Sequence, residues 1–185
     1  MKILYGNLAN FSEADYNAEY SSLPDCLRKR IDRIRKSEDK KRSLAGKILL
    51  KKLLLEEYGI KDPIIEYTQK GAPYLKNSDL KISIAHSYDG IAVAADETHV
   101  GIDIEKIRDI DLALCKKVCT EREDEYVFSA NTRDEGILRF FEVWTAKEAY
   151  FKKQGTGIVD LKSVCIFDLD RRVEIKDGYM IQTVK

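Results

Sequence analysis

Gly101-Ile102-Asp103-Ile104-Glu105 is the stretch that constrains the fold of this chain most. The two isoleucines alternate with Gly101, Asp103 and Glu105, which is the period of a half-buried strand with its apolar residues on one side. Both carboxylates therefore point to the same side of the strand, roughly 6.6 Å apart. Two flexible carboxylates at this separation can share one cation, directly or through its water.

A second stretch, from Trp144 to Lys152, has helical spacing, because Trp144, Glu148 and Lys152 recur every four residues. It adds a third carboxylate and a lysine. Carboxylate oxygens suit Mg²⁺, which keeps waters and substrate phosphates in its shell, whereas zinc would need nearby His or Cys ligands. The sequence favours magnesium on a pyrophosphate. For either stretch alone, a solvated strand face or an exposed helical ion pair remains an open alternative.

These residues belong to a recognisable pair of motifs. Gly101–Glu105, followed by Phe-x-x-x-Trp-x-x-Lys-Glu-Ala-x-x-Lys from Phe140 to Lys152, resembles the paired signature of the 4′-phosphopantetheinyl transferases. Ile82–Ser87 looks like the Ser-His-Ser element of that family, and Glu38–Gly46 resembles its basic segment for coenzyme A. The four elements stand in the right order between about residues 28 and 157, and they are most similar to the larger, surfactin-synthetase-activating type.

The resemblance implies a fold and a reaction. The expected fold is α+β, with two similar halves in one chain (residues 1–97 and 98–185) and antiparallel sheets packed on long helices. Coenzyme A and the metal would lie between the halves. The implied reaction moves the 4′-phosphopantetheine arm of coenzyme A to a serine of an apo acyl or peptidyl carrier protein and releases adenosine 3′,5′-bisphosphate. Because both halves share one chain, we expect a monomer.

The resemblance also assigns the reacting residues. Asp103, Glu105 and Glu148 would be the magnesium ligands, and Glu148 would take the serine proton directly or through water. Lys147 and Lys152 point in different directions on a helix, so both are not expected to reach one oxygen. Lys152 matches the family lysine and is expected on the pyrophosphate.

Further residues would bind the nucleotide of coenzyme A. By matching motifs these are Arg42, Ser43 and His86, with Arg28 and Arg30 near the 3′-phosphate although that alignment can slip by one residue. For His86, a hydrogen-bonded histidine that caps a strand end remains the alternative.

One departure from the family pattern concerns the nucleotide contacts. The family commonly has Gly-Lys-Pro where this chain has Gly71-Ala72-Pro73, so a basic contact is missing or is supplied by Lys70. The chain is also short for the surfactin type, and the loss falls after Lys162.

Local patterns predict the individual elements. A helix is expected to begin near Pro24 and end near Lys36, and an antiparallel meander is expected to contain four strands between residues 64 and 105. The other expected elements are a first strand at residues 1–7, helices at 38–58, 121–129 and 133–153, and strands at 164–167, 173–176 and 179–184.

Composition limits the other functional classes. The 32 basic and 32 acidic residues cancel, which argues against a general nucleic-acid binder. Two alternatives stay open: a nucleotide- or nucleic-acid-binding module that uses the basic helix at 28–36, and a metal-dependent phosphohydrolase. No apolar run reaches membrane-spanning length, and the first residues are expected to form a strand rather than a signal peptide. We expect a cytoplasmic protein without a membrane partner, whose four cysteines are reduced thiols.

Overall fold

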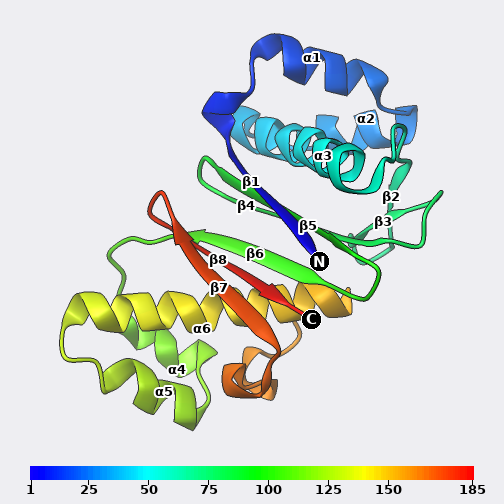
Figure 1. Ribbon diagram of the computed structural model, residues 1–185. Coiled ribbons are helices and arrows are strands. Elements are labelled where there is room, and N and C mark those ends of the chain that lie inside the picture. Colours follow the sequence, from blue (N-terminus) through cyan, green and yellow to red (C-terminus); the bar gives the residue numbers. More distant parts are fainter.

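The computed structural model describes all residues 1–185 and consists of two α+β halves whose sheets face each other (Figure 1). In the first half, the three-stranded antiparallel sheet has the order β1-β5-β4, and a separate hairpin joins β2 and β3. This half contains α1 (Glu13–Ser22), α2 (Asp25–Asp32), α3 (Ser37–Tyr58), β1 (Lys2–Asn7), β2 (Ile65–Tyr67), β3 (Pro73–Leu75), β4 (Lys81–Ser87) and β5 (Gly90–Asp96).

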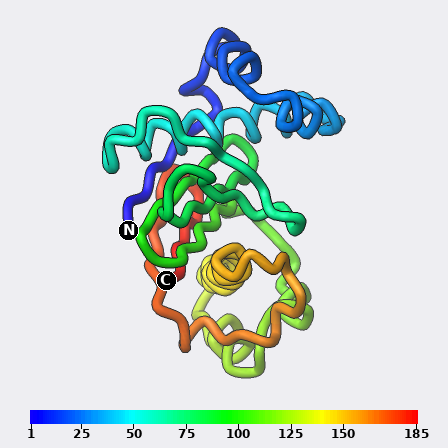
Figure 2. The backbone as a smooth tube through the Cα atoms, turned by 90° about the vertical axis from the view of Figure 1, so that its right-hand side faces the viewer, coloured from blue at the N-terminus to red at the C-terminus, as the bar shows by residue number.

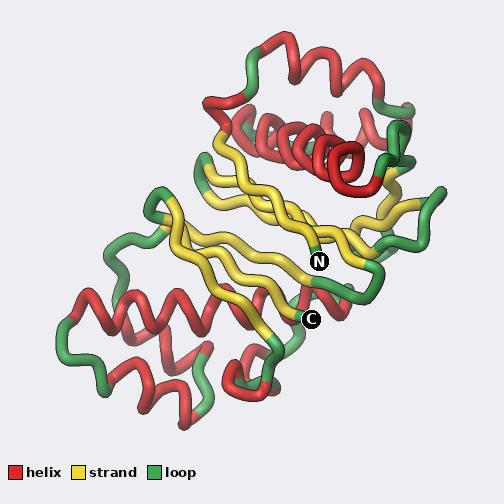
Figure 3. The backbone as a smooth tube through the Cα atoms, viewed as in Figure 1, coloured by secondary structure: helices red, strands yellow, loops and turns green.

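The second half repeats the plan with one long helix under an antiparallel sheet of order β6-β8-β7. It contains β6 (Gly101–Lys106), α4 (Cys115–Val118), α5 (Glu121–Phe128), α6 (Arg133–Gln154), β7 (Arg171–Lys176) and β8 (Tyr179–Val184). The molecule is thus layered as helices, sheet, sheet, helices (Figure 3). No helix is long and apolar enough to cross a membrane. The expected α+β class, with antiparallel sheets on long helices, is confirmed.

Strand β5 shows why the two sheets stack. Ile91, Val93 and Ala95 belong to the core under α3, whereas Ala92 and Ala94 belong to a second core between the two sheets. Every residue of β5 is buried, because one face meets a helix and the other face meets a sheet. Small alanines on the inner face permit this close sheet-to-sheet contact.

The two chain ends lie side by side at one edge of the layers (Figure 2). The amino group of Met1 and Nζ of Lys185 both pair with the carboxylate of Asp96, at 2.9 and 2.8 Å. These contacts keep the pKa of Asp96 below its ordinary range, against the opposing effect of burial, which is the largest single influence.

The predicted four-strand meander is wrong at both ends, since only β4 and β5 pair as expected. At one end, β2 pairs with β3 in a separate hairpin. The other end is β6. This strand pairs with β8, not with β5. It instead runs beside β4, where two serine hydroxyls take the place of backbone partners: Oγ of Ser83 accepts from the amide of Ile102 at 3.0 Å, and Oγ of Ser87 accepts from the amide of Lys106 at 3.2 Å. Side chains therefore join the edges of two separate sheets, which strand periodicity does not reveal.

Smaller differences have local causes. The predicted strand at 164–167 is wrong, since the chain forms 3₁₀ turns at Leu161–Ser163 and Ile166–Asp168, and the Ile166 amide donates to Glu123 instead of to a strand. The helix expected at 24–36 ends at Asp32. Helix α1 and strand β3 were not predicted. The helices expected at 38–58, 121–129 and 133–153 are confirmed to within one residue at each end.

Candidate active site between the two halves

The contact between β6 and α6 begins at Gly101, where the two backbones nearly touch. A Cβ atom at this position would lie 1.8 Å from the carbonyl oxygen of Ala149 and 2.6 Å from the amide nitrogen of Lys153. No side chain fits into that space. The glycine that opens the strand motif therefore lets β6 approach α6 closely enough for strand carboxylates to meet helix side chains.

Asp103 and Lys152 are the first pair formed across this contact. Nζ of Lys152 donates to Oδ1 of Asp103 at 2.6 Å, while Oδ2 of Asp103 is buried without any hydrogen-bond partner. The predicted alternation of β6 is confirmed, since Ile102 and Ile104 lie in the core between the sheets on the opposite side. Lys152, expected on a pyrophosphate, here contacts an aspartate that was expected on magnesium.

Glu105 is held by hydrogen bonds from both halves. Its Oε2 accepts from the hydroxyl of Ser87 at 2.7 Å, and its Oε1 accepts from Nε1 of Trp144 at 3.4 Å. Trp144 also stacks on Phe140, as expected for an aromatic residue in the core. Ser87 thus connects β4 to the backbone and to a carboxylate of β6, a role that the sequence did not predict.

Glu148 lies one turn before Lys152 on α6 and is half-buried. Burial, followed by repulsion from Asp103, raises the pKa of Glu148 to about 7, although Lys152 opposes the shift. Burial also raises the pKa of Asp103 to about 6, with Lys152 again opposing and Glu105 reinforcing. Burial is thus the largest cause of both pKa shifts, and repulsion between the neighbouring carboxylates adds to it.

This arrangement can be tested against the metal that the sequence suggested. The donor set of Asp103, Glu105 and Glu148 is all oxygen, one oxygen of Asp103 is buried and free, and the raised pKa values would be relieved by a cation. The three carboxylates do not yet form a group whose oxygens all lie within 4.8 Å of one another. The all-oxygen donor set and the free buried oxygen of Asp103 nevertheless fit Mg²⁺.

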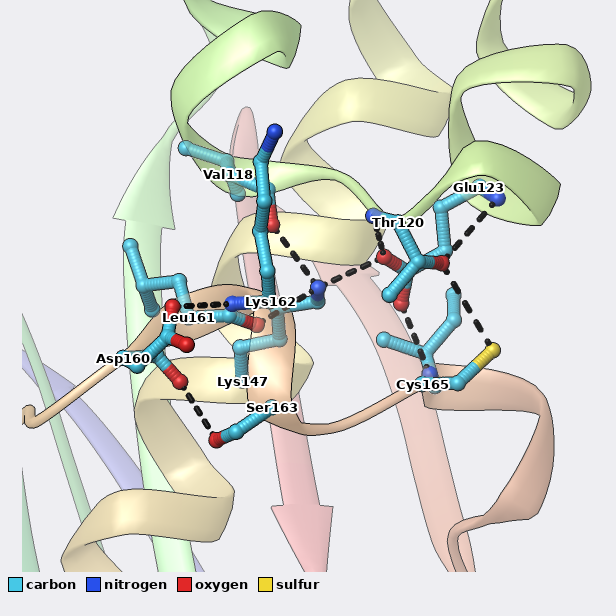
Figure 4. Close-up of polar contacts among 10 residues, drawn as sticks. Val118, Thr120, Glu123, Lys147, Asp160, Leu161, Lys162, Ser163 and Cys165 are labelled. Atoms are coloured by element: carbon cyan, nitrogen blue, oxygen red, sulfur yellow. Dashed lines mark hydrogen bonds and ion pairs between the residues drawn. The ribbon is translucent and has the colours of Figure 1, made fainter.

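Lys147 directly precedes Glu148 in the sequence, but its side chain lies on the face of α6 that packs against α4 and α5. There it is fully buried (Figure 4). Its Nζ lies 2.6 Å from Oε2 of Glu123 and donates to the carbonyl oxygens of Val118 and Leu161, each at 2.8 Å. Glu123 in turn accepts from the amides of Thr120 and Ile166, at 2.7 and 2.8 Å. These contacts fix α6 between two loops and so hold the segment that contains Glu148.

A cavity of about 690 Å³ opens between the two halves, and Glu148 is the one of the three site carboxylates that lines it. Its walls come from the β2–β3–β4 region between Thr68 and Ile84 and from the end of α6 and the following loop, between Glu148 and Ile158. Lys152 lines it, as do Lys70 and Ala72. Its size and cationic wall suit a phosphorylated small molecule.

Arg42 and His86 lie on the first half, near Lys152. Nη1 of Arg42 donates to the carbonyl of Tyr88 at 3.0 Å, and Nη2 donates to Asp39 at 2.5 Å, which joins α3 to the β4–β5 turn. The pKa of His86 is lowered. Desolvation by the surrounding protein is the largest cause, although the residue as a whole is exposed, and the positive charges of Lys152 and Arg42 add to it. The lowered pKa favours the neutral imidazole of His86 at pH 7.

Arg30 and Arg28, which were also predicted to bind the nucleotide, lie in different surroundings. The guanidinium of Arg30 stacks on the ring of Tyr67, 4.3 Å from its centre, and lies next to Gly71 at the cavity. Arg28 instead points toward α1, donating to the Ser21 carbonyl at 3.3 Å and pairing with Asp25.

Ser43 contacts Lys47, a residue that was not predicted from the sequence. Nζ of Lys47 reaches Oγ of Ser43 at 3.4 Å and donates to the hydroxyl of Tyr67 at 2.8 Å. Lys47 is buried, and its Nζ contacts only hydroxyl and carbonyl oxygens. Its position one turn after Ser43, among the leucines of α3, was the available signal.

Family models match both halves of the chain. The model of the 4′-phosphopantetheinyl transferase superfamily matches residues 99–178, and a model of the N-terminal part of 4′-phosphopantetheinyl transferases matches residues 10–98. Together the two matches span nearly the whole two-sheet structure.

Curated relatives carry the same name. A 4′-phosphopantetheinyl transferase of Aneurinibacillus migulanus is 32% identical over 124 residues, which cover 65% of this chain and 51% of the relative. One of Bacillus pumilus is 32% identical over 130 residues, or 69% and 55%. The Sfp protein of Bacillus subtilis strain 168 is 28% identical over 134 residues, or 71% and 59%. The chain thus spans about half the length of the curated relatives it matches.

The fold and the carboxylate–lysine site define an α+β protein with the architecture of that group. The chain belongs to the 4′-phosphopantetheinyl transferase superfamily and is similar to its Sfp-type members.

Proposed function

We propose that this protein transfers the 4′-phosphopantetheine arm of coenzyme A to a serine of an apo acyl or peptidyl carrier protein, with Mg²⁺, and releases adenosine 3′,5′-bisphosphate. The observation that carries the proposal is Glu148, a half-buried acid with its pKa raised to about 7, on the wall of a cavity and one turn from Lys152. Family membership supports the same reaction.

In the proposed mechanism, Glu148 accepts the proton of the carrier serine directly or through a water. A serine hydroxyl is a weak nucleophile, so a carboxylate positioned to take its proton is needed for the transfer. Lys152 is about one-third exposed, so it can move from Asp103 to a pyrophosphate oxygen. Asp103, Glu105 and Glu148 would hold magnesium, which when bound neutralises charge that develops on the phosphates.

The nucleotide part of coenzyme A is proposed to lie along the first half. Arg42 and neutral His86 would contact phosphate oxygens, and Arg30, Ser43 and the Tyr67 region would flank the nucleotide. Arg28 would have to leave Asp25 to take part. Charge-assisted contacts of this kind are short and geometrically selective, which supports arginine in that position.

The decisive experiment mixes the protein with coenzyme A, Mg²⁺ and an apo carrier and follows the carrier mass. Transfer adds the phosphopantetheine mass to wild-type carrier and not to a carrier without the acceptor serine. The matched protein control is Glu125→Ala, which removes an exposed glutamate of α5 and should leave transfer unchanged. Cleavage of coenzyme A without a carrier product would identify a phosphohydrolase, and binding without either product would identify a nucleotide-binding module.

We also propose that the protein works as a monomer in the cytoplasm, where coenzyme A and apo carriers would be met. A single chain supplies Asp103, Glu148 and Lys152, so no second copy is needed to assemble the carboxylates. Light scattering should give the mass of one chain, 21.3 kDa, at the concentrations used for transfer. A panel of carriers from fatty-acid, polyketide and nonribosomal-peptide systems would identify the preferred partner.

A further inference from the structure

A second group of metal-ligating side chains lies at the turn between α4 and α5, away from the carboxylate site. Sγ of Cys115, Sγ of Cys119 and a carboxylate oxygen of Asp124 all lie within 4.8 Å of one another. Cys115 begins α4, Cys119 follows its last residue, and Asp124 lies in the first turn of α5. None of the three lines the cavity between the halves.

Both thiols of this group and one oxygen of its carboxylate are buried. Cys115 and Cys119 are 0% and 3% exposed, and neither forms a disulfide. Oδ1 of Asp124 is buried beside them without a hydrogen-bond partner. The neighbouring Glu123 has the opposite character, because its two oxygens are occupied by Lys147 and by two amides. A buried carboxylate oxygen without a partner is destabilising unless something else satisfies it.

We propose that Cys115, Cys119 and Asp124 bind one thiophilic divalent cation of the zinc class, with water in the fourth position. Two thiolates and one carboxylate are a donor set that zinc accepts and magnesium does not. With Zn–S near 2.3 Å and Zn–O near 2.0–2.2 Å, tetrahedral ligand atoms lie roughly 3.5–4 Å apart. The observed group would close around an ion with only a small movement.

The choice of a thiophilic ion follows from the donor atoms. A metal binds the thiolate form of cysteine, so an ion must displace the protons of Cys115 and Cys119 to bind. Only ions with strong affinity for thiolate do so at neutral pH. Asp124 is half-buried, so it offers the route by which the ion and its water would enter.

The position of the site suggests what the metal would stabilise. The ligands bracket Val118 and Glu123, two of the residues that hold Lys147. A metal at this turn would therefore fix the loop that anchors α6. This role is independent of the transfer reaction, so its test does not depend on the proposed function.

The test uses the full-length, reduced protein, stripped with a chelator and kept in excess Mg²⁺ to occupy the carboxylate site. Cd²⁺ is titrated while the thiolate-to-metal charge-transfer absorption is recorded, and Zn²⁺ affinity is measured by competition with a chromophoric chelator. We expect one equivalent of Cd²⁺ with this absorption and a higher melting temperature with Zn²⁺. Absence of the absorption in wild-type protein would overturn the proposal.

Variants assign the ligands. Cys119→Ser should abolish the absorption, and Asp124→Asn should weaken Zn²⁺ binding at least tenfold and remove the rise in melting temperature. Because Asp124 is partly exposed and asparagine has the same size, Asp124→Asn keeps the test open if a cysteine variant does not fold. Cys26→Ser is the matched control and should behave as wild type. Loss of binding in Cys26→Ser or Cys165→Ser, or retention of wild-type affinity in Asp124→Asn, would contradict this ligand set.

Discussion

Two of the three lysines of helix α6, Lys147 and Lys152, each contact a carboxylate from another element. Lys147 and Glu123 are both 0% exposed, and Nζ of Lys147 has three oxygen partners. Lys152 is 32% exposed and has one partner, Asp103, whose other oxygen is free. The two ion pairs have the same length, 2.6 Å, but they differ in exposure and in the number of oxygen atoms around the lysine.

This difference separates anchoring from reactivity. Lys147 has no spare N–H with which to bind a substrate, so its contribution is to hold the helix in place. Lys152 has two unused N–H donors. Near it are the free oxygen of Asp103 and the carboxyl group of Glu148, whose pKa is raised. Hydrogen-bond donors and acceptors that lack partners at a partly buried position are available to bind a ligand.

The largest expected effect comes from breaking the buried pair. Lys147→Met should lower the free energy of unfolding by about 3–5 kcal/mol, because it leaves the carboxylate of Glu123 buried without its cation. Urea denaturation followed by circular dichroism measures the change. Lys152→Met is the matched control, and its effect should stay below about 1.5 kcal/mol because Asp103 can take up a proton.

A double variant sharpens the first prediction. Lys147→Met with Glu123→Gln removes both charges and keeps an amide oxygen to accept from Ile166, so part of the lost stability should return. Equal losses in Lys147→Met and Lys152→Met would show that burial does not distinguish the two pairs.

The second prediction reverses the order of the two positions for activity. Glu148→Gln and Lys152→Ala should each lower kcat for transfer by at least about 10²-fold, as expected for loss of a general base or a phosphate contact. Asp103→Ala and Glu105→Ala should also lower transfer strongly. Single-turnover assays on carrier protein provide the rates, and circular dichroism checks that each variant folds. Near-normal turnover in Glu148→Gln would rule out the proposed base.

The third prediction concerns pH and magnesium. Asp103 and Glu148 have pKa values of about 6 and 7 in the fold, against about 3.9 and 4.3 in an unfolded chain. The metal-free fold thus binds more protons between pH 4 and 7, and its stability falls as pH rises through that window, by roughly 1–2 kcal/mol per acid after allowance for solvent.

Magnesium binds the ionised carboxylates, so the rise in melting temperature that it causes should be larger at pH 8 than at pH 5. Differential scanning fluorimetry with and without Mg²⁺ measures both curves, and Glu148→Gln should flatten the pH dependence. A magnesium effect that is the same at both pH values would show that these acids are not its ligands.

The parts of the fold that follow from local periodicity could be predicted from sequence. The alternation of β6 and the spacing of α6 are properties of neighbouring residues, and both are confirmed. The pairing of β6 with β8 could not be predicted, because it joins residues about 80 positions apart along the chain. The expected partner was β5, the strand that precedes β6 in the sequence. Helix α1 escaped notice because its sequence has almost no apolar periodicity and depends on a capping box at Ser12.

The candidate site shows the same division. Motif resemblance brought Asp103, Glu148 and Lys152 together as candidates, and the structure places Lys152 on Asp103. The contact of Lys147 with Glu123 could not be read from spacing, because 24 residues and a turn separate them. The hydroxyl of Ser87 on Glu105 depends on two sheet edges meeting, which no local pattern encodes.

The smallest expected effect lies on the cavity wall opposite Lys152. Ala72 lines the cavity and stands where the family motif has a lysine, and its Cβ lies near Gly155 at the end of α6. Ala72→Lys should tighten coenzyme A by about 1 kcal/mol, or roughly fivefold, because a full charge-assisted contact of 1.5–3 kcal/mol is reduced by exposure. Dephospho-coenzyme A should gain less.

Calorimetry on both nucleotides tests this, with Ala72→Gln as a polar control of lower charge. The gain of Ala72→Lys should shrink as salt rises, since contacts to a multiply charged phosphate in an open cavity are screened. Arg42→Ala should reduce the preference for coenzyme A over its dephospho form in both backgrounds. If Ala72→Gln tightens coenzyme A as much as Ala72→Lys does, side-chain length rather than charge explains the effect, and the cavity wall does not bind the nucleotide phosphates.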